Sequence, residues 1–161
     1  MIKSVTLVCQ KGEFGKGGKM MEFYNEFRHV IDAKNRLFIP AKLREDLGES
    51  FFVTRKISEQ CLAIYSAEEW TKFATKLKSL PDSKMGTIKQ FVFSKTALLS
   101  PDSHGRILLP ANLVKYANLE KNVVIVGVGD HIQIWNEDDW DAKEQSIDLV
   151  EMQALLSEFG M

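Results

Sequence analysis

Two short segments of the sequence place an arginine four residues after an aspartate. Asp32 precedes Arg36, and Asp102 precedes Arg106. A guanidinium donates two parallel hydrogen bonds to O6 and N7 of guanine, so an arginine held beside a tight turn suits base recognition in the major groove of DNA. An equally open interpretation is that each arginine pairs with its own aspartate and holds the loop together. Because carboxylates repel phosphates, we expect Asp32 and Asp102 to stabilise the turns and orient the arginines.

These two segments belong to copies of one repeated unit. Residues 32–43 resemble residues 102–113, position by position. The offset between positions 32 and 102 also aligns further residues without a gap, namely Val53 with Val123, Ile64 with Ile134 and Trp70 with Trp140. Similarity at a fixed offset is typical of a duplicated structural unit. We therefore predict a first repeat in residues 21–81 and a second repeat, with a C-terminal helix, in residues 82–161.

The residues around the two arginines add candidate DNA contacts. Lys34 and His104 lie within the turns and could touch a phosphate or a base edge, although solvated turn side chains explain them equally well. Asn35 and Gly105 favour turn geometry. Three more basic residues lie near the first arginine in the sequence, namely Arg28, Lys42 and Arg44. Their counterparts in the second repeat are uncharged, namely Leu98, Asn112 and Val114. We expect the first half to dominate contacts with the DNA backbone.

Each repeat predicts the same order of elements. A strand leads into the turn and a short β-rich run, a proline begins a short helix, and a hairpin precedes a closing helix with an N-cap at Ser66 or Asn136. In the first repeat the ranges are 24–31, 41–47, 51–57, 61–65 and 67–80. In the second repeat they are 91–99, 111–116, 122–128, 131–135 and 137–159, with a tight turn at Gly129-Asp130. A linker at 81–86 and a short helix separate the repeats.

The motifs together resemble those of the MraZ family. The resemblance rests on the double motif Asp-x-x-x-Arg-(Leu/Ile)-x-(Ile/Leu)-Pro-Ala, on residues 124–129, and on Ile132-Gln133-Ile134-Trp135. It covers residue 21 to the C-terminal helix. It implies an α+β fold, a tandem AbrB-like swapped-hairpin β-core with flanking helices and an internal pseudo-two-fold repeat.

The same resemblance implies a function. It predicts a sequence-specific transcriptional regulator, a repressor, that binds double-stranded DNA at tandem G-rich direct repeats upstream of the division and cell-wall gene cluster. It also predicts a ring-like homo-oligomer. We therefore expect a cytoplasmic, nucleoid-associated protein.

The acidic C-terminal segment supports an alternative function. The net charge is −1, but residues 137–161 hold eight acidic residues and one lysine, so the remainder of the chain is positive. This segregation permits a basic DNA-binding face, and it equally permits a scaffold that binds other proteins through the acidic helix. Four apolar residues could form a stripe on that helix, which we expect to pack on its own domain. They are Ile147, Val150, Leu155 and Phe159.

Several classes of protein lack support in the sequence. The arginines would keep Asp32 and Asp102 ionised, and the chain has no nucleophile elbow or glycine-rich phosphate loop, so we do not expect an enzyme. Cys9 and Cys61 form no CxxC motif, and the three histidines are scattered, so we expect no metal, cofactor or small-molecule ligand. No apolar run reaches the ~18 residues of a membrane span.

Residues 1–20 precede the usual start of MraZ-like chains. We expect an N-terminal extension that is either disordered or the product of a misassigned start codon. Residues 16–19, Lys-Gly-Gly-Lys, could be encoded by a purine-rich ribosome-binding sequence just before Met20-Met21.

Overall fold

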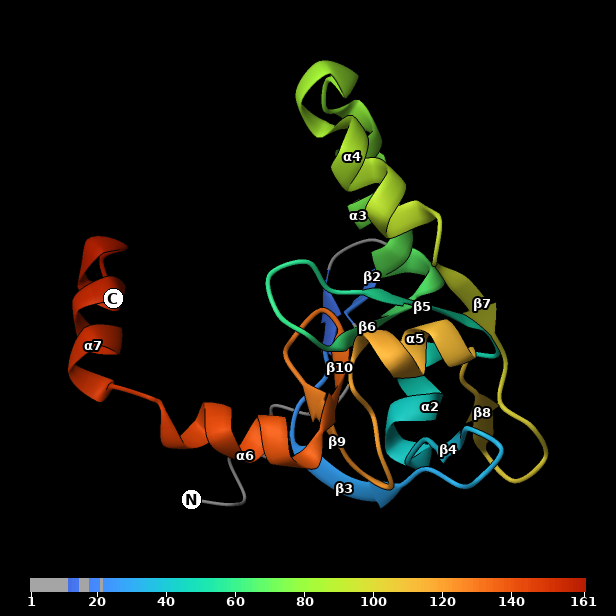
Figure 1. Ribbon diagram of the computed structural model, residues 1–161. Helices are drawn as coiled ribbons and strands as arrows, with labels where there is room; N and C mark the ends of the chain where they lie inside the picture. The colour runs from blue at the N-terminus through green and yellow to red at the C-terminus, as the bar shows by residue number, and fades with distance from the viewer. Residues whose placement is uncertain (1–11, 15–17, 21) are drawn as a thin grey trace.

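A six-stranded antiparallel sheet lies at the centre of the computed structural model, which describes residues 12–14, 18–20 and 22–161 (Figure 1). In order across the sheet the strands are β3 (Glu26–Val30), β9 (Asn122–Gly127), β10 (Ile132–Asn136), β6 (Leu62–Ser66), β5 (Phe51–Arg55) and β7 (Ala97–Leu99). A separate two-stranded ribbon pairs β4 (Arg36–Phe38) with β8 (Arg106–Leu108). Near the N-terminus, β1 (Gly12–Phe14) pairs with β2 (Gly18–Met20).

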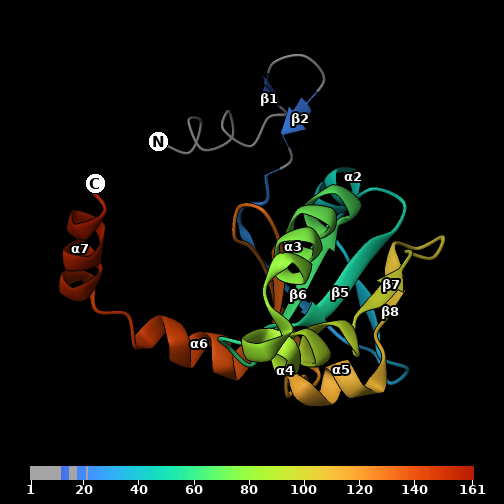
Figure 2. The same ribbon diagram turned by 90° about the horizontal axis from the view of Figure 1, so that it is seen from above.

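The helices lie around this sheet and ribbon. Short helices α2 (Ala41–Leu47) and α5 (Ala111–Tyr116) follow the two ribbon strands, and α3 (Ala67–Ser79) and α4 (Asp82–Phe93) form a helical hairpin at one end of the molecule. Helix α6 (Glu137–Gln145) begins against strands β9 and β10, and the last helix, α7 (Leu149–Glu158), lies away from the sheet in both views (Figures 1 and 2).

The pairing of strands confirms the predicted α+β fold with a swapped-hairpin core. The first strand of each half pairs with the hairpin of the other half, because β3 joins β9 and β7 joins β5. If each strand is exchanged for its counterpart in the other half, the strand order is the same read from the opposite edge of the sheet. At the centre of this symmetry Ala63 pairs with Gln133, and Leu37 pairs with Ile107, so that each residue meets its own counterpart in the other repeat. The two halves therefore share one core.

Local signals in the sequence are also confirmed. Helices α2 and α5 have the predicted bounds, and the hairpin strands and α3 differ from prediction by at most two residues at each end. The Ser66 side chain accepts a hydrogen bond from the Glu69 N–H, and Asn136 accepts one from Asp139, so both N-caps form. The Tyr65–Trp70 and Trp135–Trp140 pairs, 5.8 and 5.6 Å between ring centroids, pack as part of the interior.

The prediction of a strand over residues 91–99 was wrong in its first part. Helix α4 continues to Phe93, and only Ala97–Leu99 forms a strand. Val92 is buried against α3 and β5, and Arg55 lies over the Phe91 ring at 3.7 Å and donates to its carbonyl oxygen. This packing stabilises a helix in an apolar, aromatic run whose residue types favour a strand.

The prediction of one closing helix over residues 137–159 was also wrong. The helix ends at Gln145, and a new one begins after Asp148, whose carboxylate accepts the N–H groups of Val150 and Glu151. The apolar stripe does not pack on its own domain as expected, because no residue of α7 is buried and Phe159 is 81% exposed.

The expectation of an extension at residues 1–20 falls mostly outside the described residues, apart from the strand pair β1–β2. Within the described ranges, every helix is too short or too polar to cross a membrane.

The close approach of two backbone segments at Gly127 gives a test of this fold. A Cβ at Gly127 would lie 2.4 Å from the Tyr24 nitrogen, where Phe23 and Gly129 exchange backbone hydrogen bonds. We expect Gly127→Ala to lower the free energy of unfolding by ~1–3 kcal/mol, measured by urea denaturation. The matched Gly86→Ala meets no atom within 4 Å in α4 and should raise it by roughly 0.5–1 kcal/mol. Equal effects of the two changes would contradict the described packing.

Candidate nucleic-acid interface

The β4–β8 ribbon brings the two arginines onto one face. Arg36 pairs with Leu108, and Phe38 pairs with Arg106, while Leu37 and Ile107 between them are fully buried. Since successive residues of a strand point to opposite faces, burial of the central pair turns both arginines outward. They are diagonal neighbours, which places their backbones roughly 7–8 Å apart. Two guanidiniums from opposite halves of the chain thus share one exposed surface.

Each turn is held by its aspartate through one repeated set of hydrogen bonds. Asp32 Oδ1 accepts the backbone N–H groups of Lys34 and Arg36, both at 2.9 Å. Its Oδ2 accepts the Arg36 Nε–H at 2.6 Å. In the second turn Asp102 Oδ1 accepts two N–H groups at the same distances, and Oδ2 accepts Arg106 Nε–H at 3.1 Å. Each aspartate therefore fixes both the backbone of its turn and its arginine.

This pairing leaves the outer edge of each guanidinium available. In both arginines Nε is the nitrogen that contacts the aspartate. Within residues 22–161, neither arginine has a hydrogen-bond partner for its terminal nitrogens. The arginine side chains are 34% and 32% exposed. The two interpretations of the Asp–Arg spacing are therefore compatible, because one edge holds the loop and another can bind a ligand.

The two turns are also joined to each other. The Ile39 N–H donates to the Gly105 carbonyl at 3.0 Å, and the Leu109 N–H donates to the Asn35 carbonyl at 2.9 Å. Asn35 and Gly105 have positive φ angles of 60° and 77°, which asparagine tolerates and glycine adopts without strain. These cross-connections fix the position of one arginine relative to the other.

The hydrogen bonds keep both carboxylates ionised. The hydrogen bond from the backbone N–H of Arg36 is the main cause that lowers the pKa of Asp32. The guanidinium of Arg36 and the backbone N–H of Lys34 lower this pKa further. The backbone N–H of Arg106, together with that of His104, lowers the pKa of Asp102 in the same way. An ionised carboxylate is the form that orients a guanidinium.

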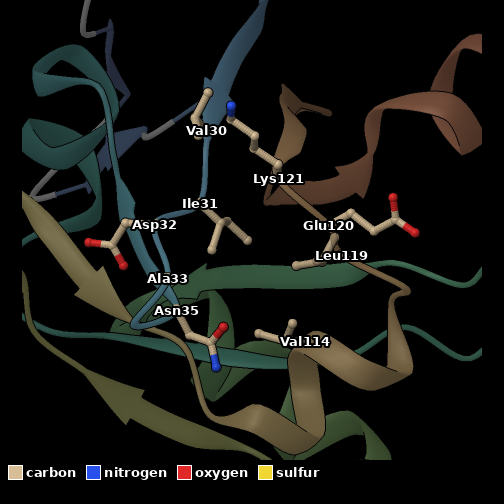
Figure 3. A pocket seen from close by; sticks show the side chains of 9 residues that line it. All are labelled: Val30, Ile31, Asp32, Ala33, Asn35, Val114, Leu119, Glu120 and Lys121. Atoms are coloured by element: carbon tan, nitrogen blue, oxygen red, sulfur yellow. The ribbon is translucent and has the colours of Figure 1, made fainter.

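The repeat is asymmetric at the position of Arg44. Its Nε–H donates to the Ile39 carbonyl, and its guanidinium covers the second turn so closely that a Cβ on Gly105 would lie 2.7 Å from Cζ. At the equivalent place beside the first turn stands Val114, and an open pocket of about 490 Å³ remains between it and Asn35 (Figure 3). The pocket is lined by Val30, Ile31, Asp32, Ala33, Asn35, Val114, Leu119, Glu120 and Lys121.

The remaining predicted site residues divide into two groups. Lys34 and His104 lie in the turns beside the arginines, and Lys42 is exposed in the first turn of α2. Arg28 lies apart on β3, where it forms ion pairs with Glu26 at 3.0 Å and Asp141 at 2.8 Å. These acids raise the pKa of Arg28 and compete with any phosphate for it.

The sequence matches one known protein family over most of its length. The profile of a family described as "MraZ protein, putative antitoxin-like" matches residues 23–87 and 92–155. The chain belongs to the MraZ family. It is 41% identical over 142 residues to a protein of Clostridium tetani named "Transcriptional regulator MraZ", covering 86% of this chain and 99% of that relative. A relative of the same name from Acetivibrio thermocellus is 43% identical over 122 residues, with 74% and 85% covered.

In this MraZ chain the exposed face of the ribbon holds two residues that the sequence patterns did not identify as site residues. Phe38 and Leu108 lie on the same face as the arginines and are 36% and 61% exposed. Each lies two residues after an arginine, so strand alternation alone could have identified them. They give the face an apolar component between its two cations.

Other chemistry is weakly represented in the described residues of this MraZ chain. Residues 22–161 contain no cluster of histidine, cysteine and acidic side chains suited to a metal ion. Cys61 is buried, and burial raises the pKa of its thiol to about 12. Its thiolate, the reactive form, is therefore scarce at neutral pH.

The depressed pKa values predict a dependence of stability on pH. A carboxyl group whose folded pKa lies below its ordinary value of 3.8 contributes stability above that pH and loses it as the pH falls through the folded pKa. We expect Asp32→Asn and Asp102→Asn to reduce the loss of stability on acidification below pH 3.8, measured by urea denaturation. The exposed Glu144→Gln serves as the control. An unchanged acid limb in the double variant would contradict this role of the aspartates.

Proposed function

We propose that this chain is a sequence-specific DNA-binding transcriptional regulator that acts as a repressor. Its target would be tandem G-rich direct repeats upstream of the division and cell-wall gene cluster. The relatives are named as transcriptional regulators and not as enzymes, which supports the general class. The target and the sign of regulation come from the resemblance of the motifs. Binding to promoter DNA would place the protein on the nucleoid.

The placement of Arg36 and Arg106 on one face of the ribbon is the observation that carries this proposal. The major groove of B-DNA admits a two-stranded ribbon, and an arginine forms its commonest specific contact there with guanine O6 and N7. Because Asp32 and Asp102 fix the Nε side of each guanidinium, the terminal nitrogens can meet a base edge with little loss of side-chain entropy. Phe38 and Leu108 could meet thymine methyl groups between them.

Contacts with the DNA backbone should come mainly from the first half. Lys34 and Lys42 are exposed near the ribbon, and each offers a flexible cation to a phosphate. His104 and Asn112 hold the equivalent positions in the second half. Arg44 differs from these lysines because its guanidinium already supports the second turn. We assign Arg44 a positioning role together with any phosphate contact, and Arg28 is the weakest candidate because two acids hold it.

We also propose that several copies act together in a ring-like homo-oligomer. One chain holds one pair of arginine turns, whereas several tandem repeats require several chains at fixed spacing. Linked copies gain affinity through effective concentration without any new contact. The alternative of a scaffold that binds proteins through its acidic helices is favoured by the exposed apolar surface of α7. Binding assays separate the two functions, because a scaffold without DNA affinity would fail the following test.

Removal of the arginines tests the DNA-binding proposal. We expect Arg36→Ala and Arg106→Ala each to weaken binding of a G-rich repeat duplex by ~1–3 kcal/mol, with near-complete loss of specific binding in the double variant. Electrophoretic mobility shift and fluorescence anisotropy measure the affinity, and circular dichroism checks the fold. Lys72→Ala, on α3 and distant from the ribbon, is the matched loss of a cation (Figure 1). Undiminished specific binding by the folded double variant would refute the assignment.

A further inference from the structure

Helix α7 presents an apolar surface that no other part of the described chain, residues 12–14, 18–20 and 22–161, buries. Leu149, Met152, Leu156 and Phe159 recur at helical spacing and are 70%, 46%, 48% and 81% exposed. Residues three, seven and ten positions apart lie on one side of a helix. Both views show α7 away from the sheet and from helices α2 to α5, connected only to α6 (Figures 1 and 2). Exposed apolar side chains gathered on one side of a helix are typical of a surface that contacts a partner.

The preceding helix holds α7 out from the body. Arg28 joins β3 to Asp141 of α6, and the Trp140 Nε1–H donates to Glu26 at 3.1 Å. Lys143, near the end of α6, forms an ion pair with Glu59. These contacts fix α6 on the sheet, and the Asp148 cap begins α7 only three residues after α6 ends. Helix α7 therefore begins close to an α6 that is held on the sheet, and its own apolar side chains stay exposed.

The charge of α7 indicates the chemistry of that partner. Residues 146–161 contain Asp148, Glu151 and Glu158 and no lysine or arginine. Two α7 helices packed together would bring like charges into contact without any compensating cation, which is unfavourable. A surface that combines lysines with partly exposed apolar side chains is the complementary partner.

The helical hairpin α3–α4 is such a surface on the same chain. Residues 67–96 contain six lysines and three acidic residues. Lys76, Lys78 and Lys84 are exposed, and within residues 22–161 none of the three has an ion-pair partner. Leu80 is 37% exposed, and Met85, in the first turns of α4, is half-buried. The hairpin lies at a different side of the molecule from α7 (Figure 1), so a second copy is needed to bring the two surfaces together.

We propose that α7 of one chain docks on the α3–α4 hairpin of a second copy. The contact joins two different surfaces, so each copy keeps one free surface of each kind and can add a further copy until a ring closes. The inference rests on the proposed function, for which it names the contact between copies. The other basic, partly apolar surface, around Arg36 and Phe38, is excluded as the partner because an acidic helix there would cover the face proposed for DNA.

Reversal of charge on the two surfaces tests this contact. The first variant carries Lys76→Glu, Lys78→Glu and Lys84→Glu, the second carries Glu151→Lys and Glu158→Lys, and a third combines all five changes. We expect the wild-type chain to sediment as an assembly of several copies without DNA. The first and second variants should fall towards the mass of a single chain, and the combined variant should recover the wild-type mass, because its charges are again complementary.

Controls make the result specific to the proposed surfaces. Lys115→Glu and Lys121→Glu together reverse two charges at exposed positions elsewhere, so they change the net charge as much as the second variant does, in the direction of the first, and should leave the mass unchanged. A wild-type chain that is monomeric, a combined variant that stays dissociated, or a second variant that assembles more strongly than the wild type would overturn the inference. The last result would indicate pairing of α7 with α7. Binding of a duplex with one repeat, measured in parallel, judges the proposed function independently of the mass.

Discussion

The antiparallel pairing of β4 with β8 determines where the candidate site lies. At its centre the fully buried Leu37 and Ile107 face the core, and burial of each such side chain stabilises the fold by ~1.5–3 kcal/mol. Because these two residues point inward, the residues on either side of them must point outward. The same pairing aligns the turns so that their backbones exchange hydrogen bonds. Core packing thus positions two arginines that no local interaction would bring together.

Duplication within one chain allows the two halves to differ, which two identical chains could not do. Arg44 covers Gly105, whereas Val114, its counterpart, leaves a pocket beside Asn35 (Figure 3). A glycine at position 105 gives the guanidinium room, and the first turn can hold an asparagine because no arginine lies over it. The difference in side-chain volume between Arg44 and Val114 therefore explains why the turn position is Gly105 in one repeat and Asn35 in the other.

Regular patterns in the sequence predicted most of the fold and the two turns that carry Arg36 and Arg106. The constant offset between the repeats could be recognised by comparing the sequence with itself. The prolines before α2 and α5 and the caps at Ser66 and Asn136 depend on local geometry, so they too could be recognised without a structure. The helix through Phe91 could not be predicted from the sequence, because contacts with Arg55 and α3 outweigh the local preference of these residues for a strand. The exposure of α7 was not predicted for a related reason. An apolar stripe predicts burial, but it does not show whether its own chain or another molecule buries it.

The candidate site shows the same division between local and long-range information. The spacing of Asp32 and Arg36 predicts their pairing as one of two alternatives, and the structure shows that pair. The ion pair of Arg28 with Asp141 depends on how α6 lies against β3. No pattern near Arg28 in the sequence indicates that contact.

The central claim is that the outer edge of Arg36 and Arg106 binds guanine. Replacement of guanine by 7-deazaguanine in a single-repeat duplex removes the N7 acceptor and leaves the pairing of bases intact. The account predicts that the wild-type chain loses affinity on the order of tenfold, whereas the Arg36→Ala, Arg106→Ala double variant loses no further affinity. The opposite result, an equal loss for the wild type and the double variant, would contradict guanine recognition by these arginines.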